Sequence, residues 1–434
     1  MASTVSFTEF PEDVQVSILS FLTADDVSSF CCASKRFAEL YKDGGSKLWH
    51  SLCERRWGPR TCVPQWGQGR VPFKLLYATL LRWDRLLGFW RRCGGGSHTS
   101  YRSPSSPALL FFEWGPRYLS GSRIFPSEDG GYEVVKAPFL WMGISPEGRT
   151  VCYLDPDGDS ATAGDQIVFS DADSDLDLVP VNVDFIGMTH LRIEEDAGFS
   201  YSARVGGGGD DGNSSNGEEG GGSPEEKLEI YQYYANRGSP EALRRLRKRG
   251  KDRLRRLRRW ETEHFLKIVD SSPTPARPLQ GLWKGICEGL KLEFYLVTYD
   301  GAGLSCRRVG DLSERLVSSI PVFWTSNPVL VESPLSPEDA LIYDSRIHLR
   351  SLSGEYRETA HEAVTRFMNI NSSYDLVLPG LVEAAMNPWR VEGRIWQYEN
   401  GTFGFGFLRD NFIVDLRHIA QNGCLLDISG SSGD

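Results

Sequence analysis

The sequence lacks the residue patterns that mark a metal centre, a disulfide framework or a common catalytic site. Its nine cysteines are odd in number and form no C-x-x-C pair, which is typical of free thiols in a reducing compartment. None of its seven histidines has the spacing of a metal ligand. There is no Gly-x-Ser-x-Gly motif in a strand–turn–helix setting and no phosphate loop ending in Gly-Lys-Ser/Thr. We therefore expect a non-catalytic protein without metal or cofactor.

Long apolar runs and an excess of positive charge are also missing. No stretch is long enough to suggest a membrane span, and Glu9, Glu12 and Asp13 stand where a secretory signal would be basic. The net charge of −10 argues against a protein that coats nucleic acid. Hydrophobic residues make up 40% of the 434 residues, which is enough for a sizeable core. We expect the nucleus, the cytoplasm or both as its location.

The first sixty positions have the pattern of a small helical module. Val14, Ile18, Phe21 and Leu22 recur at helical spacing, and Pro11 suits a first helical turn. Thr23 and Asp26 have the spacing of a capping box that opens a second helix, so the two helices are predicted to be close in sequence. A unit this small buries little by itself, and its apolar face indicates a partner that covers it.

Several short patterns in this module occur in a characteristic order. Phe10-Pro11 stands where a Leu-Pro is usual, and the apolar run Ile18–Leu22 and the polar turn Thr23–Asp26 follow. The order continues with an apolar helix and two late signals: Val27–Cys32, Ser34–Phe37 and Leu48-Trp49. The set spans roughly 45 residues and resembles the F-box family; an ordinary helical hairpin is the alternative.

The F-box resemblance implies that the module docks on a Skp-like adaptor and, through it, on cullin and RING subunits. The residues it assigns to this docking are Phe10, Pro11, Val14, Ile18, Leu19, Leu22, Val27, Phe37 and Trp49. Phe37 and Trp49 are expected to support the docking face from behind.

The rest of the chain predicts an α+β fold in which the helices are followed by a mostly antiparallel β-barrel-like domain. We expect one barrel, interrupted by an insertion, because closure removes exposed strand edges. The expected layout is a helical module (1–57), a helical linker (58–93), a first β-rich half (105–194), a disordered Gly/acidic insertion (195–240), a basic helix (241–268) and a second β-rich half (278–428).

Short runs of aromatic and β-branched residues mark the expected strands. Asp300-Gly301 and Glu399–Thr402 are predicted to be hairpin turns. The expected strands are Ala108–Trp114, Tyr132–Val135, Phe139–Met142, Thr150–Leu154, Gln166–Phe169, Met188–Ile193, Leu292–Tyr299, Ala340–Leu349, Gly393–Tyr398, Phe403–Leu408 and Asn411–Leu416.

Several short patches carry a second resemblance. They are the basic helix ending near Phe265–Lys267, the stretches Gly281–Gly285 and Gly289–Glu293, and the closing hairpin Gly401–Phe405 with the strand that ends at Asp415-Leu416. They resemble the β-barrel F-box-only substrate receptors of SCF ubiquitin ligases, of the human cyclin-D-directed type. The resemblance implies that the barrel holds a target protein for ubiquitination. The target and the residues that bind it stay open.

Two other functions remain alternatives. Gly281-Leu282-Trp283 is similar to the Gly-x-Trp opening of lipocalins, which would make the barrel a small-ligand binder. Eleven of the 48 Lys and Arg residues lie between Arg244 and Arg259. A solvated helix that neutralises the acidic tract ranks first for this segment, a nuclear address second and nucleic-acid binding third.

Overall fold

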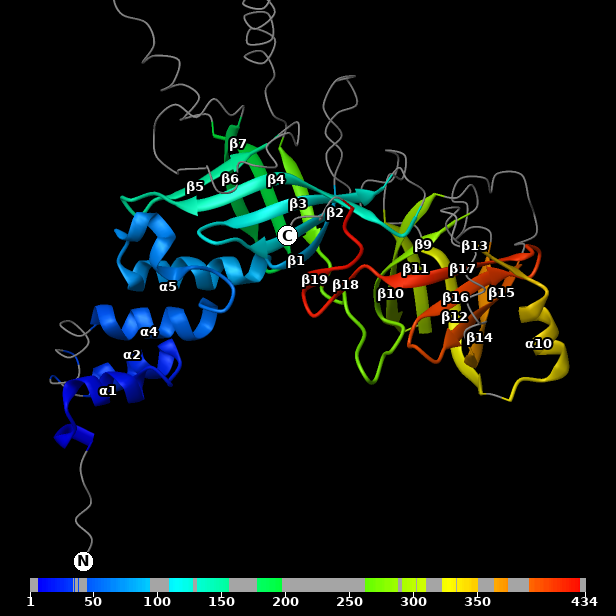
Figure 1. Ribbon diagram of the computed structural model, residues 1–434, viewed down its shortest axis with the longest axis horizontal. Coiled ribbons are helices and arrows are strands. Elements are labelled where there is room, and N and C mark those ends of the chain that lie inside the picture. The colour runs from blue at the N-terminus through cyan, green and yellow to red at the C-terminus, as the bar shows by residue number, and fades with distance from the viewer. Residues whose placement is uncertain are drawn as a thin grey trace, which may run out of the picture. The chain divides into compact units, whose positions relative to one another are not determined.

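The structure is a computed structural model, and its described residues fall into helices followed by two β-sheets (Figure 1). It describes residues 7–33, 35, 38, 45–93, 109–127, 131–155, 178–196, 262–287, 291–301, 303–309, 322–332, 334–349, 363–373 and 390–429. Met1–Ile193 and Glu263–Asp434 belong to one compact unit, and Glu194–Thr262 belongs to a second.

The N-terminal part is helical, as its apolar spacing predicts. Its helices are α1 (Glu12–Leu19), α2 (Ala24–Ala33), α4 (Gly45–Trp57) and α5 (Phe73–Trp83), with short 3-10 turns η1 (Phe7–Glu9), η2 (Val63–Gly69) and η3 (Asp84–Leu86). The capping box before α2 is confirmed: the Asp26 amide donates to Thr23 Oγ1 at 3.1 Å, and Thr23 Oγ1 donates to Asp26 Oδ2 at 2.7 Å.

The first sheet is a closed antiparallel barrel. Its strands are β1 (Gly88–Arg92), β2 (Leu109–Trp114), β3 (Leu119–Pro126), β4 (Val134–Ile144), β5 (Thr150–Leu154), β6 (Val179–Ile186), β7 (His190–Glu195) and β8 (Glu263–Lys267). Trp90 of β1 pairs with Leu110 of β2 on one side and with Lys267 of β8 on the other. This double pairing closes the barrel.

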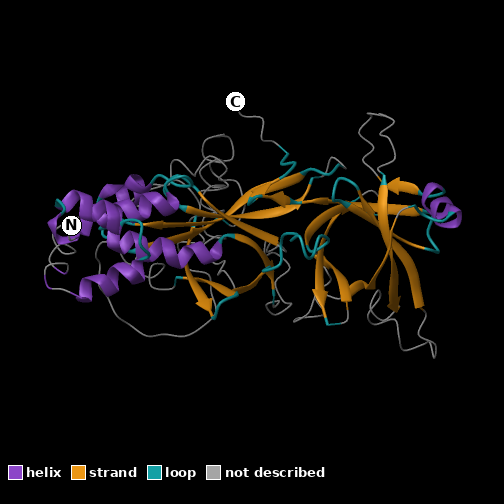
Figure 2. Ribbon diagram, turned by 90° about the horizontal axis from the view of Figure 1, so that it is seen from below, coloured by secondary structure: helices purple, strands orange, loops and turns teal. Residues whose placement is uncertain are grey.

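The second sheet follows in the sequence and also closes on itself. Its strands are β9 (Gly281–Ile286), β10 (Leu292–Asp300), β11 (Gly303–Val309), β12 (Val322–Glu332), β13 (Ile347–Leu349), β14 (Val364–Ser373), β15 (Arg390–Tyr398), β16 (Phe403–Phe407) and β17 (Phe412–His418). β17 pairs with both β16 and β9, which joins the two ends of the sheet. Helix α10 (Pro337–Asp344) lies beside this sheet (Figure 2), and its Tyr343 packs with Phe367, Trp396 and Tyr398 of the sheet. A small hairpin, β18 (Ala420–Gln421) and β19 (Cys424–Leu425), follows β17.

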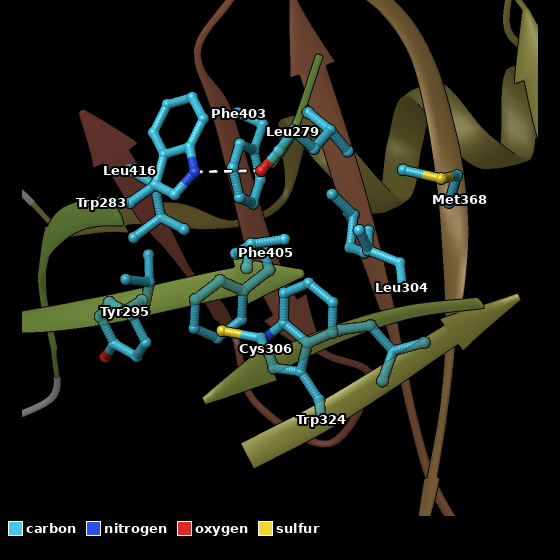
Figure 3. Packing of buried hydrophobic residues seen from close by; sticks show 14 of the residues in the cluster. Leu279, Trp283, Tyr295, Leu304, Cys306, Trp324, Met368, Phe403, Phe405 and Leu416 are labelled. Carbon is cyan, nitrogen blue, oxygen red and sulfur yellow. Dashed lines mark hydrogen bonds between the residues drawn. The ribbon is translucent and has the colours of Figure 1, made fainter. Parts of the chain in front are cut away.

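Aromatic side chains fill the inside of the second sheet. Trp283, Tyr295, Trp324 and Phe403 have no exposed surface and pack in one cluster (Figure 3). The indole Nε1 of Trp283 donates to the Leu279 carbonyl at 3.0 Å, so its polar atom is satisfied within the apolar core. The interior is therefore packed with side chains from opposite strands.

The predicted fold class is confirmed, but the expected single barrel is wrong. Two sheets close separately, the first from β1 to β8 and the second through β17 and β9. The strand order depends on pairings such as Arg91 with Leu266, which no local pattern shows.

Three segments differ from the expected elements. The linker over 58–93 is helical only up to Leu86, because Gly88–Arg92 form β1. The basic helix over 241–268 does not reach its expected end, because Glu263–Lys267 form β8. Its other residues up to 261, the insertion from 197 onward and the expected strand at Gln166–Phe169 lie outside the described residues.

The expected strand over Ala340–Leu349 is wrong in its first half. Pro337–Asp344 form α10, and Ile347–Leu349 form β13. The helix begins at Ser336, whose hydroxyl accepts the Asp339 amide at 3.1 Å, and Pro337 occupies the first turn. This start signal was present in the sequence and outweighs the β-branched pattern that follows.

Hydrogen bonds from the segment after α4 join the helices to the first barrel. Thr61 Oγ1 donates to the carbonyls of Gly115 and Pro116 at 2.7 and 2.9 Å. The same oxygen accepts the indole Nε1 of Trp66 at 2.9 Å, and the Trp66 ring meets Trp114 edge to face at 6.1 Å. The buried Thr61 hydroxyl, together with the Cys62 amide that donates to the Pro116 carbonyl at 2.8 Å, therefore connects the helical linker with the turn after β2.

Replacing this hydroxyl tests the connection. We expect Thr61→Val to lower the free energy of unfolding by about 1–3 kcal/mol, because the buried Trp66 Nε1 loses its acceptor and the Gly115 carbonyl loses the Thr61 hydroxyl, while the Pro116 carbonyl keeps the Cys62 amide. Urea denaturation measures this. Thr79→Val is the matched control, since Thr79 is only half-buried and its hydroxyl donates to the Leu75 carbonyl of its own helix. Equal effects of the two substitutions would contradict the account.

The last described segment also bonds to both sheets. Lys284 of β9 is fully buried, and its Nζ donates to the Leu426 carbonyl at 3.0 Å and pairs with Asp427 Oδ2 at 2.8 Å. Burial lowers the pKa of Lys284, and Asp427 opposes this effect. The Val134 amide of β4 donates to the Asp427 carbonyl at 2.8 Å. One residue near the C-terminus thus neutralises a buried ammonium and binds the first sheet.

We expect Asp427→Asn to lower the free energy of unfolding by about 1–3 kcal/mol, because the buried Lys284 ammonium loses its counter-charge. Asparagine tolerates the positive φ of 54° at this position, so the backbone is preserved. Thermal unfolding measures the loss. Asp410→Asn removes a partly exposed pair with Arg409 and should cost about 0–0.5 kcal/mol; a loss as small at Asp427 would refute the prediction.

Candidate adaptor-binding site

Helix α1 has two apolar faces with different surroundings. Val16 and Leu19 are buried against the rest of the helical module. Phe10, Val14 and Ile18 are spaced by four residues, so they lie along one side, and 38%, 38% and 43% of their surfaces are exposed. A small domain seldom exposes a row of large apolar side chains unless a partner covers them. We call Phe10, Pro11, Val14, Ile18 and Phe21 the open stripe.

The polar side chain of Gln15 holds the start of the open stripe in place. Gln15 is buried, and its Nε2 donates to the Phe10 carbonyl at 2.7 Å and to the Phe7 carbonyl at 3.1 Å. The Phe7 ring packs edge to face on Phe30 of α2 at 5.4 Å. These contacts fix the segment before α1, so Phe10 and Pro11 are presented on a braced backbone.

The other helices support the module from behind. Trp49 of α4 is buried and meets Tyr77 of α5 edge to face at 5.1 Å. Arg55 Nη2 donates to the Leu22 carbonyl at 2.9 Å, and its guanidinium lies 5.7 Å from the Phe21 ring centroid. Arg56 pairs with Asp84 at 2.8 Å, which joins α4 to the end of α5.

The structure divides the residues that the F-box resemblance assigns to adaptor docking. Phe10, Pro11, Val14 and Ile18 lie on the open stripe, and Leu22 is half-buried. Leu19 and Val27 are 2% and 0% exposed, so in this conformation they hold the helices together and do not face a partner. Trp49 is buried and packs on Tyr77 of α5. Phe37 lies outside the described residues.

Two residues that shape the open stripe, Phe21 and Gln15, are absent from the set assigned to docking. Phe21 is 75% exposed and extends the open stripe past the end of α1, three residues after Ile18. Its helical spacing from Val14 and Ile18 indicates in the sequence that it shares their face. Gln15 carries no comparable signal, because only the fold shows that its amide turns inward to two carbonyls.

The described residues contain buried thiols but no cluster of metal-binding side chains. They contain no group of three or more His, Cys, Asp or Glu side chains that would hold a metal ion. Burial raises the pKa of Cys53 and of Cys152 to about 12, and of Cys287 to about 11. A thiol with such a pKa is protonated at neutral pH and is a poor nucleophile. None of the described helices is long and apolar enough to cross a membrane.

The alternative functions gain no support. The aromatic cluster around Trp283 occupies the inside of the second sheet, where a lipocalin-like pocket would be expected. The basic run from Arg244 to Arg259 lies outside the described residues.

The open stripe and its support define a helical protein-docking module attached to a β-rich domain. Residues 7–55 match the F-box-like family model. The chain is similar to F-box protein At3g12350 of Arabidopsis thaliana, with 45% identity over 424 residues that cover 97% of each chain. The chain belongs to the F-box protein family. This membership supports a general role as a substrate adaptor of SCF ubiquitin ligases.

Replacing Gln15 tests whether the brace matters for docking. We expect Gln15→Met to keep the bulk of the side chain but to remove two hydrogen bonds, which costs about 1–3 kcal/mol of stability. Affinity for a Skp-like adaptor should fall as well, because Phe10 is no longer held. Calorimetric titration with purified adaptor measures this; unchanged stability and affinity would show that Gln15 has no such role.

Proposed function

We propose that this protein is the substrate-recognition subunit of an SCF-type E3 ubiquitin ligase. In this role the F-box binds a Skp-like adaptor, which connects it to cullin and RING subunits, and the β-rich domain binds a target protein. The observation that carries the proposal is the open stripe of α1, where Phe10, Val14 and Ile18 stand in one exposed row on a braced F-box module.

The chain itself performs no covalent step in this proposal. Ubiquitin is transferred from the charged conjugating enzyme, and the receptor raises the local concentration of a target lysine near that thioester. The contacts of Thr61 with Gly115 and Pro116 support this division of labour, because they join the adaptor-binding helices to the β-rich domain.

We propose the nucleus, the cytoplasm or both as the site of this activity. All nine cysteines are free, and three of them, Cys53, Cys152 and Cys306, are buried. Free buried thiols suit a reducing compartment, where SCF ligases would meet their targets.

A charge in the open stripe tests the proposal. We expect Ile18→Glu to weaken adaptor binding by about a hundredfold, equivalent to about 3 kcal/mol, because a carboxylate would have to be buried in an apolar interface. Pull-down and calorimetric titration with a purified Skp-like adaptor measure the loss. The variant should fold normally, since Ile18 is exposed in the free chain.

Leu341→Glu is the matched control, because Leu341 is 68% exposed and lies on α10, far along the chain from the F-box. It should bind the adaptor as the wild type does. Wild-type affinity of Ile18→Glu, or an absence of adaptor binding by the unmodified chain, would contradict the proposed function.

A further inference from the structure

Strand β12 extends beyond one of its two neighbours. Its pairing with β11 ends at Ser326, opposite Leu304. β11 extends no further because it begins at Gly303, directly after the turn that follows β10. From Leu330 to Glu332, β12 continues to pair with β14. Within the described residues no strand pairs with the other edge of Val329–Glu332. We call this segment the β12 edge.

The side chains of the β12 edge are apolar and open to solvent. Val329, Leu330 and Val331 are 65%, 42% and 38% exposed. Proteins usually protect a free strand edge with charged side chains, a proline or a covering loop. Here Pro328 precedes the edge inside a bulge, and three apolar residues follow it. Among the described residues, the outer backbone donors and acceptors of the edge therefore have no strand partner, and they lie beside an apolar surface.

A polar hollow of about 390 Å³ begins where the β12 edge ends. Glu332 lines it together with Arg366 of β14 and with Glu399, in the turn after β15. Arg366 Nε donates to Gln397 Oε1 at 2.6 Å, and within the described residues it forms no ion pair with either glutamate. Two carboxylates and one guanidinium give the hollow an excess of one negative charge. A basic side chain is its best electrostatic complement.

We propose that the β12 edge binds an extended segment of the target protein by strand addition, and that a lysine or arginine of this segment enters the hollow. The backbone of the segment would pair with Val329–Glu332, and apolar side chains on alternate positions would cover Val329 and Val331. The inference rests on the proposed receptor function and adds the chemistry of the target: an extended, apolar stretch with one positive charge.

A synthetic peptide tests this directly. The probe is a fluorescein-labelled hexapeptide of alternating valine and threonine with one central lysine, added to the intact chain in complex with a Skp-like adaptor. We expect saturable binding in fluorescence anisotropy and slower hydrogen exchange at Val329–Val331. A version with N-methylated backbone amides should bind at least about tenfold more weakly, because it cannot donate to the strand. Equal binding of both versions would overturn strand addition.

Two substitutions locate the site. Val329→Lys should weaken the peptide by about tenfold, because a positive charge on the edge opposes both pairing and the basic peptide. Val269→Lys is the matched control, since Val269 is equally exposed, at 68%, just after β8, and it should have no effect. Equal losses in both variants would refute the assignment to β12.

The hollow has its own test. Glu399→Gln should reduce the preference for the lysine peptide over the same peptide with glutamate, while Glu392→Gln, at the other end of β15, should leave it unchanged. An unchanged preference in Glu399→Gln would remove the basic side chain from the proposal. Edge-to-edge dimers that exclude the peptide, measured by sedimentation, would identify a second copy as the occupant and overturn it.

Adaptor binding is measured on the same preparations. If the peptide fails to bind while the adaptor still binds, the β12 inference is wrong and the receptor function is untouched. If the adaptor fails to bind while the peptide still binds the free chain at β12, the receptor function is wrong and the peptide site is retained.

Discussion

The burial of the inner face of α1 is the constraint that leaves the open stripe exposed to solvent. Val16, Leu19 and Val27 are buried inside the helical module, so α1 cannot also bury its outer row, Val14 and Ile18, against that module. Each large apolar side chain left in water is unfavourable by about 1.5–3 kcal/mol relative to full burial. The open stripe therefore favours association, and Gln15 keeps its first residues in position.

The sequence predicted those features that depend on neighbours in the chain. The capping box at Thr23, the hairpin at Asp300-Gly301 and the turn at Glu399–Thr402 all occur as expected, the last with the Thr402 amide donating to Asn400 Oδ1 at 2.8 Å. Features that depend on distant partners were missed. Trp90 lies in a strand because Leu110 and Lys267 flank it, and no local pattern separates two closed sheets from one.

The candidate site shows the same division. Helical spacing identified Val14 and Ile18, but spacing cannot tell an outward leucine from an inward one on a short helix with apolar residues on both sides. The F-box resemblance assigned Leu19 and Val27 to the docking face, but both side chains are buried. The inward turn of the Gln15 amide depends on where the Phe7 and Phe10 carbonyls point, which the fold alone decides.

The two sheets of the β-rich domain close on themselves, but strand β12 extends beyond its neighbour β11. Pairing of β1 with β8, and of β17 with β9, leaves few free edges, and packed aromatic rings stabilise the second sheet from inside. The length difference between β11 and β12 leaves one apolar edge beside a charged hollow. The proposed receptor role uses both surfaces, the open stripe for the adaptor and the β12 edge for the target.

Hydrogen exchange of the intact chain with and without a purified Skp-like adaptor tests directly whether the open stripe is the adaptor-binding surface. We expect adaptor binding to slow exchange across Phe10–Leu22 and to leave β14 to β17 unchanged. Binding of the adaptor without added protection in Phe10–Leu22, or with protection confined to the β-sheets, would contradict it.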